Sequence, residues 1–215
     1  MRPLAVEKGL ELVLELASPV PRAFVAENVA GLTRGRALGY YNLIAKSLVD
    51  AGYDVGVALL DAQWLGVPQT RSRTIFIGYR RDLGITPTFP KPLPRRYSIV
   101  DACPWLKGAV LQVGNPNHVQ KEGNSFPRGV MVRATEPCPA ILATNRNLGG
   151  GPHKLLMTDG TERVFTIPEL MRLQTFPDDF KWFGTKAEIA TQIGNAVPPR
   201  LAEAVARMIC RHMEN

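Results

Sequence analysis

The chain has 215 residues, 45% of them hydrophobic, which is enough to bury a core as one domain with an appendage or as two small domains. This composition argues against a disordered chain, and the formal net charge of +7 favours a polyanionic partner. Three widely spaced cysteines and the lack of an apolar run of about 18 residues argue against a disulfide framework, a zinc site and a membrane span. We therefore expect a soluble, cytoplasmic and nucleoid-associated protein that holds no metal.

The N-terminal part predicts a helix followed by a strand. Leu10 to Ala17 predicts a helix that ends before Pro19. Ala23 to Ala26 is apolar throughout, which predicts a buried strand in the middle of a parallel sheet. Glu27 and Asn28 end this strand, where open α/β sheets bind ligands, although a carboxylate there is also typical of helix caps and solvated turns.

A helix and two strands follow. Ala37 to Ala51 has an apolar stripe at helical spacing, and Gly52 is suited to a left-handed C-cap. Tyr53 to Ala62 and Arg73 to Tyr79 are rich in Val, Ile, Leu and Phe, which predicts two strands. This order indicates the last part of a doubly wound α/β domain. The stripe consists of Leu38, Tyr41, Ile44, Ala45 and Leu48.

The segment from Gly66 to Arg73 predicts a polar face. Strand alternation places Gln69, Arg71 and Arg73 on one side. Two guanidinium groups on one side need an anionic or carbonyl-rich partner between them. The alternative is that one arginine pairs with a buried acid and the other is exposed.

Basic residues are concentrated between positions 71 and 96. Seven occur there with one acidic residue, Asp82. Such a run indicates either a phosphate-contacting strip or a solvated surface. The seven are Arg71, Arg73, Arg80, Arg81, Lys91, Arg95 and Arg96.

From about Tyr97 to Glu162 turn signals dominate, which predicts a small, loop-rich β region. Gly129 to Ala134 and Ala140 to Thr144 are strand-like pieces, whereas Pro137-Cys138-Pro139 indicates a turn. Arginine and asparagine in loops are suited to reading base edges, but they are equally common on ordinary surfaces. The arginines of this region that we consider for DNA contact are Arg128, Arg133 and Arg146.

Helices return after this region. Capping boxes begin at Thr166 and Thr185, and Gly194 offers a stop for the second helix after Gln192. Two prolines at 198 and 199 open a last helix with an apolar stripe, so we expect the C-terminus to pack on the first domain. The stripe consists of Leu201, Val205, Met208 and Ile209.

Four blocks in this order resemble the later motifs of the DNA cytosine-5 methyltransferase family. A variable region separates the second block from the third, in the position of that family's target-recognition region. The resemblance extends from about Leu10 to Met208. The blocks are Glu27-Asn-Val29, Gln69-Thr-Arg-Ser-Arg73, Glu169-Leu-Met-Arg-Leu-Gln-Thr-Phe-Pro-Asp178 and Gln192-Ile-Gly-Asn-Ala-Val-Pro-Pro199.

The resemblance implies an α/β fold: the C-terminal part of a doubly wound, Rossmann-like methyltransferase sheet plus a loop-rich β target-recognition region. It implies a partial catalytic domain at residues 1–96 and 163–215 and a recognition region at 97–162. It also implies double-stranded DNA as the partner and S-adenosylmethionine as the cofactor.

The resemblance further implies roles for individual residues. Glu27 holds N3 and the amino group of a flipped cytosine, Asn28 supports the same loop, and Arg71 and Arg73 lie near the cytosine O2 and the DNA backbone. The cofactor candidates are Asn195, Ala196 and Val197. Gln69 joins the arginines of the recognition region as a candidate for DNA contact, and Arg172 with the turn Phe176–Asp178 organises the recognition domain.

The chain departs from the family pattern in one respect. Family members carry a glycine-rich cofactor loop and a Pro-Cys-Gln loop, whose thiolate attacks cytosine, before the Glu-Asn-Val block. Neither occurs in the 26 residues before Glu27. We therefore expect a methyltransferase portion completed by a separate or missing N-terminal half, and no activity from the chain alone. The alternatives are a non-enzymatic DNA-binding or regulatory remnant, and a relative that acts on RNA.

Overall fold

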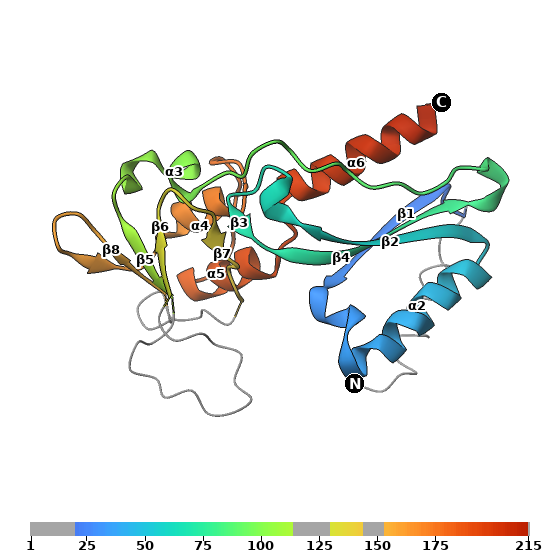
Figure 1. The fold of residues 1–215 in the computed structure, drawn as a ribbon, viewed down its shortest axis with the longest axis horizontal. Helices are drawn as coiled ribbons and strands as arrows, with labels where there is room; N and C mark the ends of the chain where they lie inside the picture. The colour runs from blue at the N-terminus through green and yellow to red at the C-terminus, as the bar shows by residue number, and fades with distance from the viewer. Residues whose placement is uncertain (1–19, 114–129, 144–152, 215) are drawn as a thin grey trace. The chain divides into compact units, whose positions relative to one another are not determined.

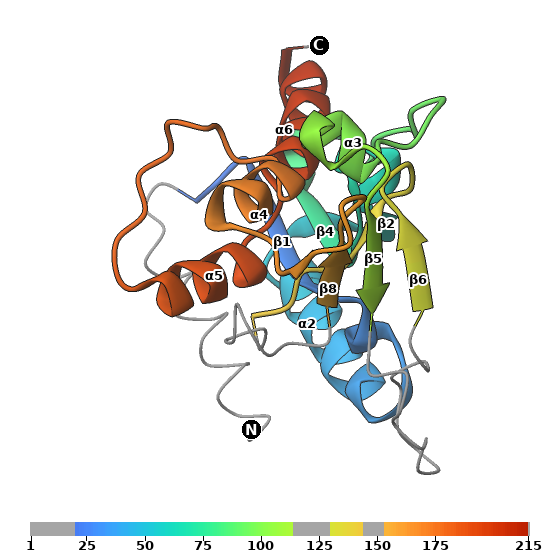
Figure 2. The ribbon, with the colours of Figure 1, turned by 90° about the vertical axis from the view of Figure 1, so that its left-hand side faces the viewer.

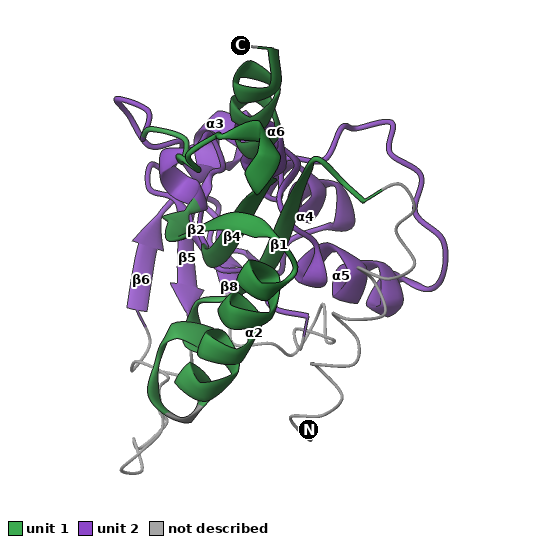
Figure 3. Ribbon diagram, turned by 90° about the vertical axis from the view of Figure 1, so that its right-hand side faces the viewer, with its two compact units in different colours: residues 1–61, 72–91, 205–215 green, residues 62–71, 92–204 purple. Residues whose placement is uncertain are grey.

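The computed structural model describes residues 20–113, 130–143 and 153–214. The predicted helix from Leu10 to Ala17 lies outside these residues, as do Arg128 and Arg146. The chain forms two compact units, shown in separate colours in Figure 3. Unit 1 comprises residues 1–61, 72–91 and 205–215, and unit 2 comprises residues 62–71 and 92–204.

Unit 1 is built on a three-stranded sheet with the order β1-β4-β2. Its strands are β1 (Ala23–Val29), β2 (Tyr53–Asp61) and β4 (Ser72–Arg80), and β4 pairs antiparallel with both neighbours. The predicted strand at Ala23 is therefore confirmed, but its central position in a parallel sheet is wrong. β4 takes the centre because it is the more apolar strand: residues 74–79 are buried, whereas burial along β1 alternates with exposure.

Two helices cover the faces of this sheet (Figure 1). α2 (Leu38–Asp50) packs Ile44 and Leu48 with Phe76 of β4 on one face. α6 (Pro199–Glu214) packs Val205, with Met208 and Ile209, against the other face, as the C-terminal stripe predicts. Gly52 follows α2 with φ of +93°, the left-handed conformation expected of a C-cap glycine.

Unit 1 departs from the expected helix stripe at one position. Leu38 is 45% exposed, because it stands at the first position of α2, before the helix reaches the core cluster around Ile44. Short 3-10 helices complete the unit. They are η1 (Ala30–Thr33), η2 (Gly35–Ala37) and η4 (Arg81–Leu83).

Unit 2 contains a four-stranded antiparallel sheet with the order β6-β5-β8-β9 (Figure 2). Leu111 and Leu155 of this sheet share a core with Leu173 and Ile193 of the helices. The strands are β5 (Val110–Val113), β6 (Val130–Arg133), β8 (His153–Leu156) and β9 (Glu162–Arg163). The helices are α3 (Ile99–Ala102), α4 (Ile167–Leu173) and α5 (Lys186–Asn195), with the 3-10 helices η3 (Ala62–Trp64) and η5 (Pro104–Leu106).

A second, two-stranded element of unit 2 changes two predictions. β3 (Gln69–Thr70) pairs parallel with β7 (Cys138–Pro139), so the predicted turn at Pro137–Pro139 contains a short strand. The strand predicted from Ala140 to Thr144 does not form over residues 140–143. Prolines at both sides of Cys138 remove two backbone donors, which limits the pairing to two residues.

Both predicted capping boxes are present. Thr166 caps α4 through Glu169, and Thr185 caps α5 through Glu188. Gly194 does not end α5, which continues to Asn195. A Cβ atom at position 194 would lie 2.5 Å from the backbone nitrogen of Ala143, so the glycine is needed for close packing and not as a stop.

The compact units divide the chain differently from the predicted domains. Residues 163–204 pack in unit 2, together with the region predicted for target recognition, and not with residues 1–61. The capping boxes of α4 and α5 predict that these helices form, but they do not determine the sheet on which the helices pack. Within the described ranges, no helix combines the length and the apolar character needed to cross a bilayer.

Candidate functional site

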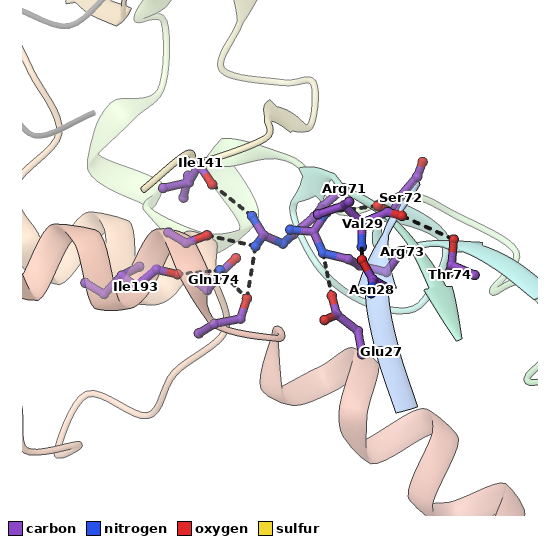
Figure 4. A network of polar contacts seen from close by, with 12 residues as sticks. Glu27, Asn28, Val29, Arg71, Ser72, Arg73, Thr74, Ile141, Gln174 and Ile193 are labelled. Atoms are coloured by element: carbon purple, nitrogen blue, oxygen red, sulfur yellow. Dashed lines mark hydrogen bonds and ion pairs between the residues drawn. The ribbon is translucent and has the colours of Figure 1, made fainter. Parts of the chain in front are cut away.

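Glu27 and Arg73 form an ion pair within unit 1. Glu27 lies on β1 opposite Ile75, and Arg73 lies on β4 opposite Val29, so their side chains project from the same face of the sheet. Arg73 Nε lies 2.6 Å from Glu27 Oε1, and the two side chains are 15% and 28% exposed. The pair therefore combines a carboxylate and a guanidinium that both stay partly exposed, and Figure 4 shows the two side chains in contact.

Asn28 fixes the end of β1. Its Oδ1 accepts a hydrogen bond of 2.8 Å from the backbone N–H of Val29. The hydroxyl of Thr74, on β4, donates to the carbonyl of Val29 at 3.4 Å. Both bonds hold the backbone directly after Glu27, so Asn28 stabilises the strand end that carries the carboxylate.

Arg71 has a different environment from Arg73. Its side chain is 2% exposed and its guanidinium binds backbone carbonyls of unit 2. One terminal nitrogen donates to Ile141 at 2.8 Å, and the other donates to Gly194 at 2.8 Å and Ala196 at 3.1 Å. Arg71 therefore has the carbonyl-rich partner that the sequence predicts, but the carbonyls belong to the protein.

The predicted common face of Gln69, Arg71 and Arg73 does not form. Arg71 lies between β3 and β4 and belongs to neither strand, so strand alternation does not extend across it. Gln69 and Arg71 belong to unit 2, whereas Arg73 belongs to unit 1. The alternative prediction is that one arginine pairs with a buried acid and the other is exposed. Its first part fits Arg73, which pairs with the partly buried Glu27. Its second part is wrong, because Arg71 is buried.

The prediction that Gln69 contacts DNA is wrong for this structure. The side chain is fully buried, and its amide is hydrogen-bonded within unit 2. Its Nε2 donates to Gln174 Oε1 at 2.7 Å, and its Oε1 accepts from the backbone N–H of Ile141 at 3.0 Å. The physical reason is that β3 pairs with β7, which encloses Gln69 in the core of the unit.

Gln174 is a residue whose importance the sequence does not reveal. It is fully buried, and its Nε2 donates to the carbonyls of Ile193 at 2.6 Å and Ala196 at 3.1 Å. Its place in the third family-like block, between Leu173 and Thr175, is the only sequence signal for it. Helix periodicity predicts only that Gln174 lies at the end of α4 and does not indicate its buried hydrogen bonds.

The cofactor candidates lie at the end of α5 and directly after it. Asn195 is exposed, and Ala196 and Val197 are half-buried. The backbone here is extended at Ala196, with φ of −67° and ψ of 151°. The three residues form a short accessible segment, and its Ala196 carbonyl accepts hydrogen bonds from Arg71 and Gln174.

The candidate DNA-contacting residues are only partly described. Arg133 is exposed at the end of β6. The basic run from 71 to 96 is divided between the two units, and several of its members pair individually with acids. The pairs are Arg73 with Glu27, Arg80 with Asp82, Arg81 with Asp54, and Arg95 with Asp101.

The two buried cysteines offer no activated thiol. Burial, together with the negative charge of Glu169, raises the pKa of Cys103 to about 12. Burial also raises the pKa of Cys138. Cys210 is exposed, on the side of α6 that does not carry the buried stripe. In the part of the chain that the structure describes, His, Cys, Asp and Glu side chains form no group of three suited to a metal ion.

Unit 2 also contains an open cavity of about 430 Å³. Its lining includes two arginines and two aspartates, and one arginine, Arg172, donates to Asp178 at 2.8 Å and 2.5 Å. Because the opposite charges balance, the cavity has no evident preference for an anion or a cation. The other charged lining residues are Asp101 and Arg200.

The comparisons with known proteins agree with the motif order. A family model described as C-5 cytosine-specific DNA methylase matches residues 10–122 and 114–211. Type II methyltransferase M.MthTI of Methanothermobacter thermautotrophicus is 32% identical and covers 90% of this chain, which spans 67% of that protein. Type II methyltransferase M1.HphI of Haemophilus parahaemolyticus is 33% identical and covers 91% of this chain, which spans 58% of that protein.

Solved structures extend the likeness to the fold. The S. pombe Dnmt2 methyltransferase aligns with a TM-score of 0.66 at 18% identity, over 97% of this chain and 72% of that chain. At this level of identity the match concerns the α/β methyltransferase fold.

Proposed function

Because the chain belongs to the C-5 cytosine-specific DNA methylase family, we propose that it is part of a DNA cytosine-5 methyltransferase and holds a flipped cytosine during methyl transfer to C5. The observation that carries this proposal is the contact of 2.6 Å between Glu27 and Arg73 on neighbouring strands. The chain spans 67%, 62% and 58% of the first three relatives by length, so we assign it the base-holding part of the activity and not the whole of it.

The chemistry of the pair suits a cytosine ring. A carboxyl group that donates its proton in a hydrogen bond to N3, and accepts one from the exocyclic amine, withdraws electron density from the ring at N3, which opens C6 to a nucleophile. A guanidinium at O2 stabilises the negative charge that develops there. Because Arg73 also contacts Glu27, it orients the carboxylate before the base arrives.

We assign Asn195, Ala196 and Val197 to the cofactor. S-adenosylmethionine supplies an electrophilic methyl group when it is bound. The accessible, extended segment after α5 fits one edge of such a molecule. We infer that the remainder of the pocket comes from another part of the enzyme.

We further propose that an N-terminal half supplies the nucleophilic thiolate and completes a Rossmann-like sheet. The two buried cysteines, Cys103 and Cys138, have raised pKa values, which disfavours the thiolate form that a nucleophile needs. Among the described residues, β1 pairs only with β4, and its Val25 and Val29 are 48% and 57% exposed. An apolar edge strand with one unpaired side is suited to receive another strand.

The target-recognition role stays with the β region of unit 2. Its sheet presents Arg133 at an exposed end, where a guanidinium can reach a phosphate or a guanine edge. Arg128 and Arg146 keep their predicted DNA-contacting role, outside the described residues.

The test is methyl transfer by the chain with and without an N-terminal half that carries the glycine-rich and Pro-Cys loops. The chain alone is expected to transfer no methyl group to duplex DNA, and the mixture to transfer it. In the mixture, Glu27→Gln is expected to lower kcat by about two orders of magnitude and DNA affinity by less than about threefold.

Asp50→Asn is the matched control, because Asp50 pairs with Lys46 on the exposed surface of α2 in the same unit. Asp50→Asn should change neither kcat nor DNA affinity. Equal losses of turnover and DNA affinity in Glu27→Gln would contradict ring activation. Tight DNA binding without transfer by the mixture would favour a regulatory remnant, and transfer to duplex RNA in place of DNA would favour an RNA-directed enzyme.

A further inference from the structure

Three buried polar side chains of unit 2 form one continuous hydrogen-bonded network. Gln69 and Gln174 are 0% exposed, and Arg71 is 2% exposed. The network connects the backbone at Ile141 with the carbonyls at the end of α5. It includes eight hydrogen bonds with lengths from 2.6 to 3.5 Å, the longest from Gln69 to the carbonyl of Leu173.

The direction of the amide bonds follows from their two ends. The N–H of Ile141 can only donate, so the amide group of Gln69 presents its oxygen there and its nitrogen to Gln174. The carbonyls of Ile193 and Ala196 can only accept, so Gln174 presents its nitrogen to them. Each amide thus fixes the orientation of the next.

The network acts on the carbonyls at the end of α5, where the backbone contact of the Ile193 carbonyl is a long hydrogen bond of 3.3 Å from the Ala196 N–H. The last carbonyls of a helix find no N–H donor within the helix, so they usually accept hydrogen bonds from water or from a capping group. Here Gln174 and Arg71 bind the carbonyls of residues 193, 194 and 196. The segment that follows α5 therefore takes its orientation from side chains far away in the sequence.

A second contact joins the same two backbone segments. Gly194 approaches residues 142 and 143 so closely that a Cβ atom would lie 2.5 Å from the Ala143 nitrogen. The hydroxyl of Thr191 also donates to the Ala143 carbonyl at 3.4 Å. The end of α5 and residues 141–143 therefore form one packed unit with the polar network.

We propose that Gln69, Gln174 and Arg71 are positioning residues, which hold the segment Asn195–Val197 in the orientation that contacts the cofactor and tie it to residues 141–143 of the recognition region. This inference rests on the proposed function, because it takes that segment as part of the cofactor site. It assigns no contact with cofactor or DNA to the three side chains themselves. Their effect is expected on cofactor affinity, since they orient backbone groups at that end of α5.

The first experiment uses the chain alone and needs no activity. Gln174→Met and Gln69→Met keep side-chain length but remove the amide. Amide hydrogen exchange in peptides covering 139–143 and 192–198 is expected to become about tenfold faster in either variant, because a buried network loses a link. Gln192→Met is the matched control, since this exposed glutamine donates to the carbonyl of Phe183 and not to the network.

The second experiment uses the chain reconstituted with the N-terminal half. KM for S-adenosylmethionine is expected to rise about tenfold in Gln174→Met, with kcat and KM for DNA changed less than about twofold. Gln192→Met should leave all three values unchanged. Glu27→Gln should show the opposite pattern, with kcat reduced and KM for the cofactor kept.

The outcomes separate the two proposals. Unchanged exchange at 139–143 and 192–198 in both network variants overturns the positioning role, whatever the activity. Faster exchange with kcat, KM for cofactor and KM for DNA all altered equally indicates general destabilisation and also overturns it. Failure of Glu27→Gln to reduce kcat, with the cofactor effect of Gln174→Met present, contradicts the base-holding proposal alone.

Discussion

Arg71 and Arg73 lie two residues apart in one motif, yet the two units use them in different ways. Arg73 of unit 1 pairs with Glu27 at a position that remains 15% exposed, and the pair can exchange its internal contact for a ligand. Arg71 of unit 2 is 2% exposed and binds three backbone carbonyls. Residues of the same type in one short motif can therefore serve chemistry and packing separately, and burial distinguishes the two roles.

Substitution of the two arginines by methionine tests this difference most directly. Arg71→Met is expected to lower the free energy of unfolding by about 2–4 kcal/mol, because the carbonyls of Ile141 and Gly194 lose a buried donor. Arg73→Met removes only a partly exposed ion pair and should lower it by less than about 1 kcal/mol. Urea denaturation of the chain measures both values.

The opposite order of stability losses would mean that Arg71 is dispensable for packing. Methyl transfer by the reconstituted enzyme provides the complementary readout for the same two variants. Arg73→Met should lose turnover at a folding stability close to that of the unchanged chain.

The capping boxes of α4 and α5 in unit 2 extend the comparison to carboxylates and to pH. Glu169 is 2% exposed, and burial by itself would raise its pKa. Hydrogen bonds from Arg163, Thr166 and Trp105 outweigh burial and lower the pKa from 4.5 to about 2. Glu188 makes the same capping box with Thr185 but is exposed.

A carboxylate with a lowered folded-state pKa stabilises the fold above its unfolded pKa, and this contribution is lost as pH falls through the folded value. Glu169 therefore contributes fully above about pH 4.5, and the loss occurs between there and about pH 2. Glu169→Gln is expected to lower stability near neutral pH by about 2 kcal/mol and to flatten the acid-induced decrease in this window. Chemical denaturation at a series of pH values measures the free energy of unfolding in this window. Glu188→Gln is the control and should have the smaller effect. A parallel pH dependence in Glu169→Gln and the unchanged chain would contradict this assignment.

The last comparison concerns one glycine in a helix of each unit, and it includes the smallest expected effect, that of Gly39→Ala. Gly194→Ala in α5 should destabilise the chain by about 1–3 kcal/mol, since the new Cβ would lie 2.5 Å from the Ala143 nitrogen. A Cβ atom added at Gly39 in α2 would meet nothing within 4 Å, so Gly39→Ala should raise the free energy of unfolding by about 0.5 kcal/mol. Thermal denaturation of the two variants is sufficient, and the same sign for both would show that helix propensity outweighs the close approach at Gly194.

Local sequence patterns predict most of the elements but not their arrangement. The periodicity of residues 37–51 and the capping boxes at Thr166 and Thr185 predict helices that are present. The apolar run at Ala23 predicts a strand, but composition cannot distinguish an edge strand from a central one. Turn signals do not exclude a two-residue strand such as Cys138–Pro139.

The sequence by itself determined the helices α2, α4, α5 and α6, the three strands of unit 1 and the order of four motifs, and the motif order leads to the methylase family. These features depend on neighbouring residues, so they can be read along the chain. Only the tertiary structure decided that Gln69 and Arg71 are buried and that Gln174 joins them. Gln69 and Gln174 are 105 residues apart in the sequence, and a hydrogen bond across such a distance depends on how the sheet and helices pack.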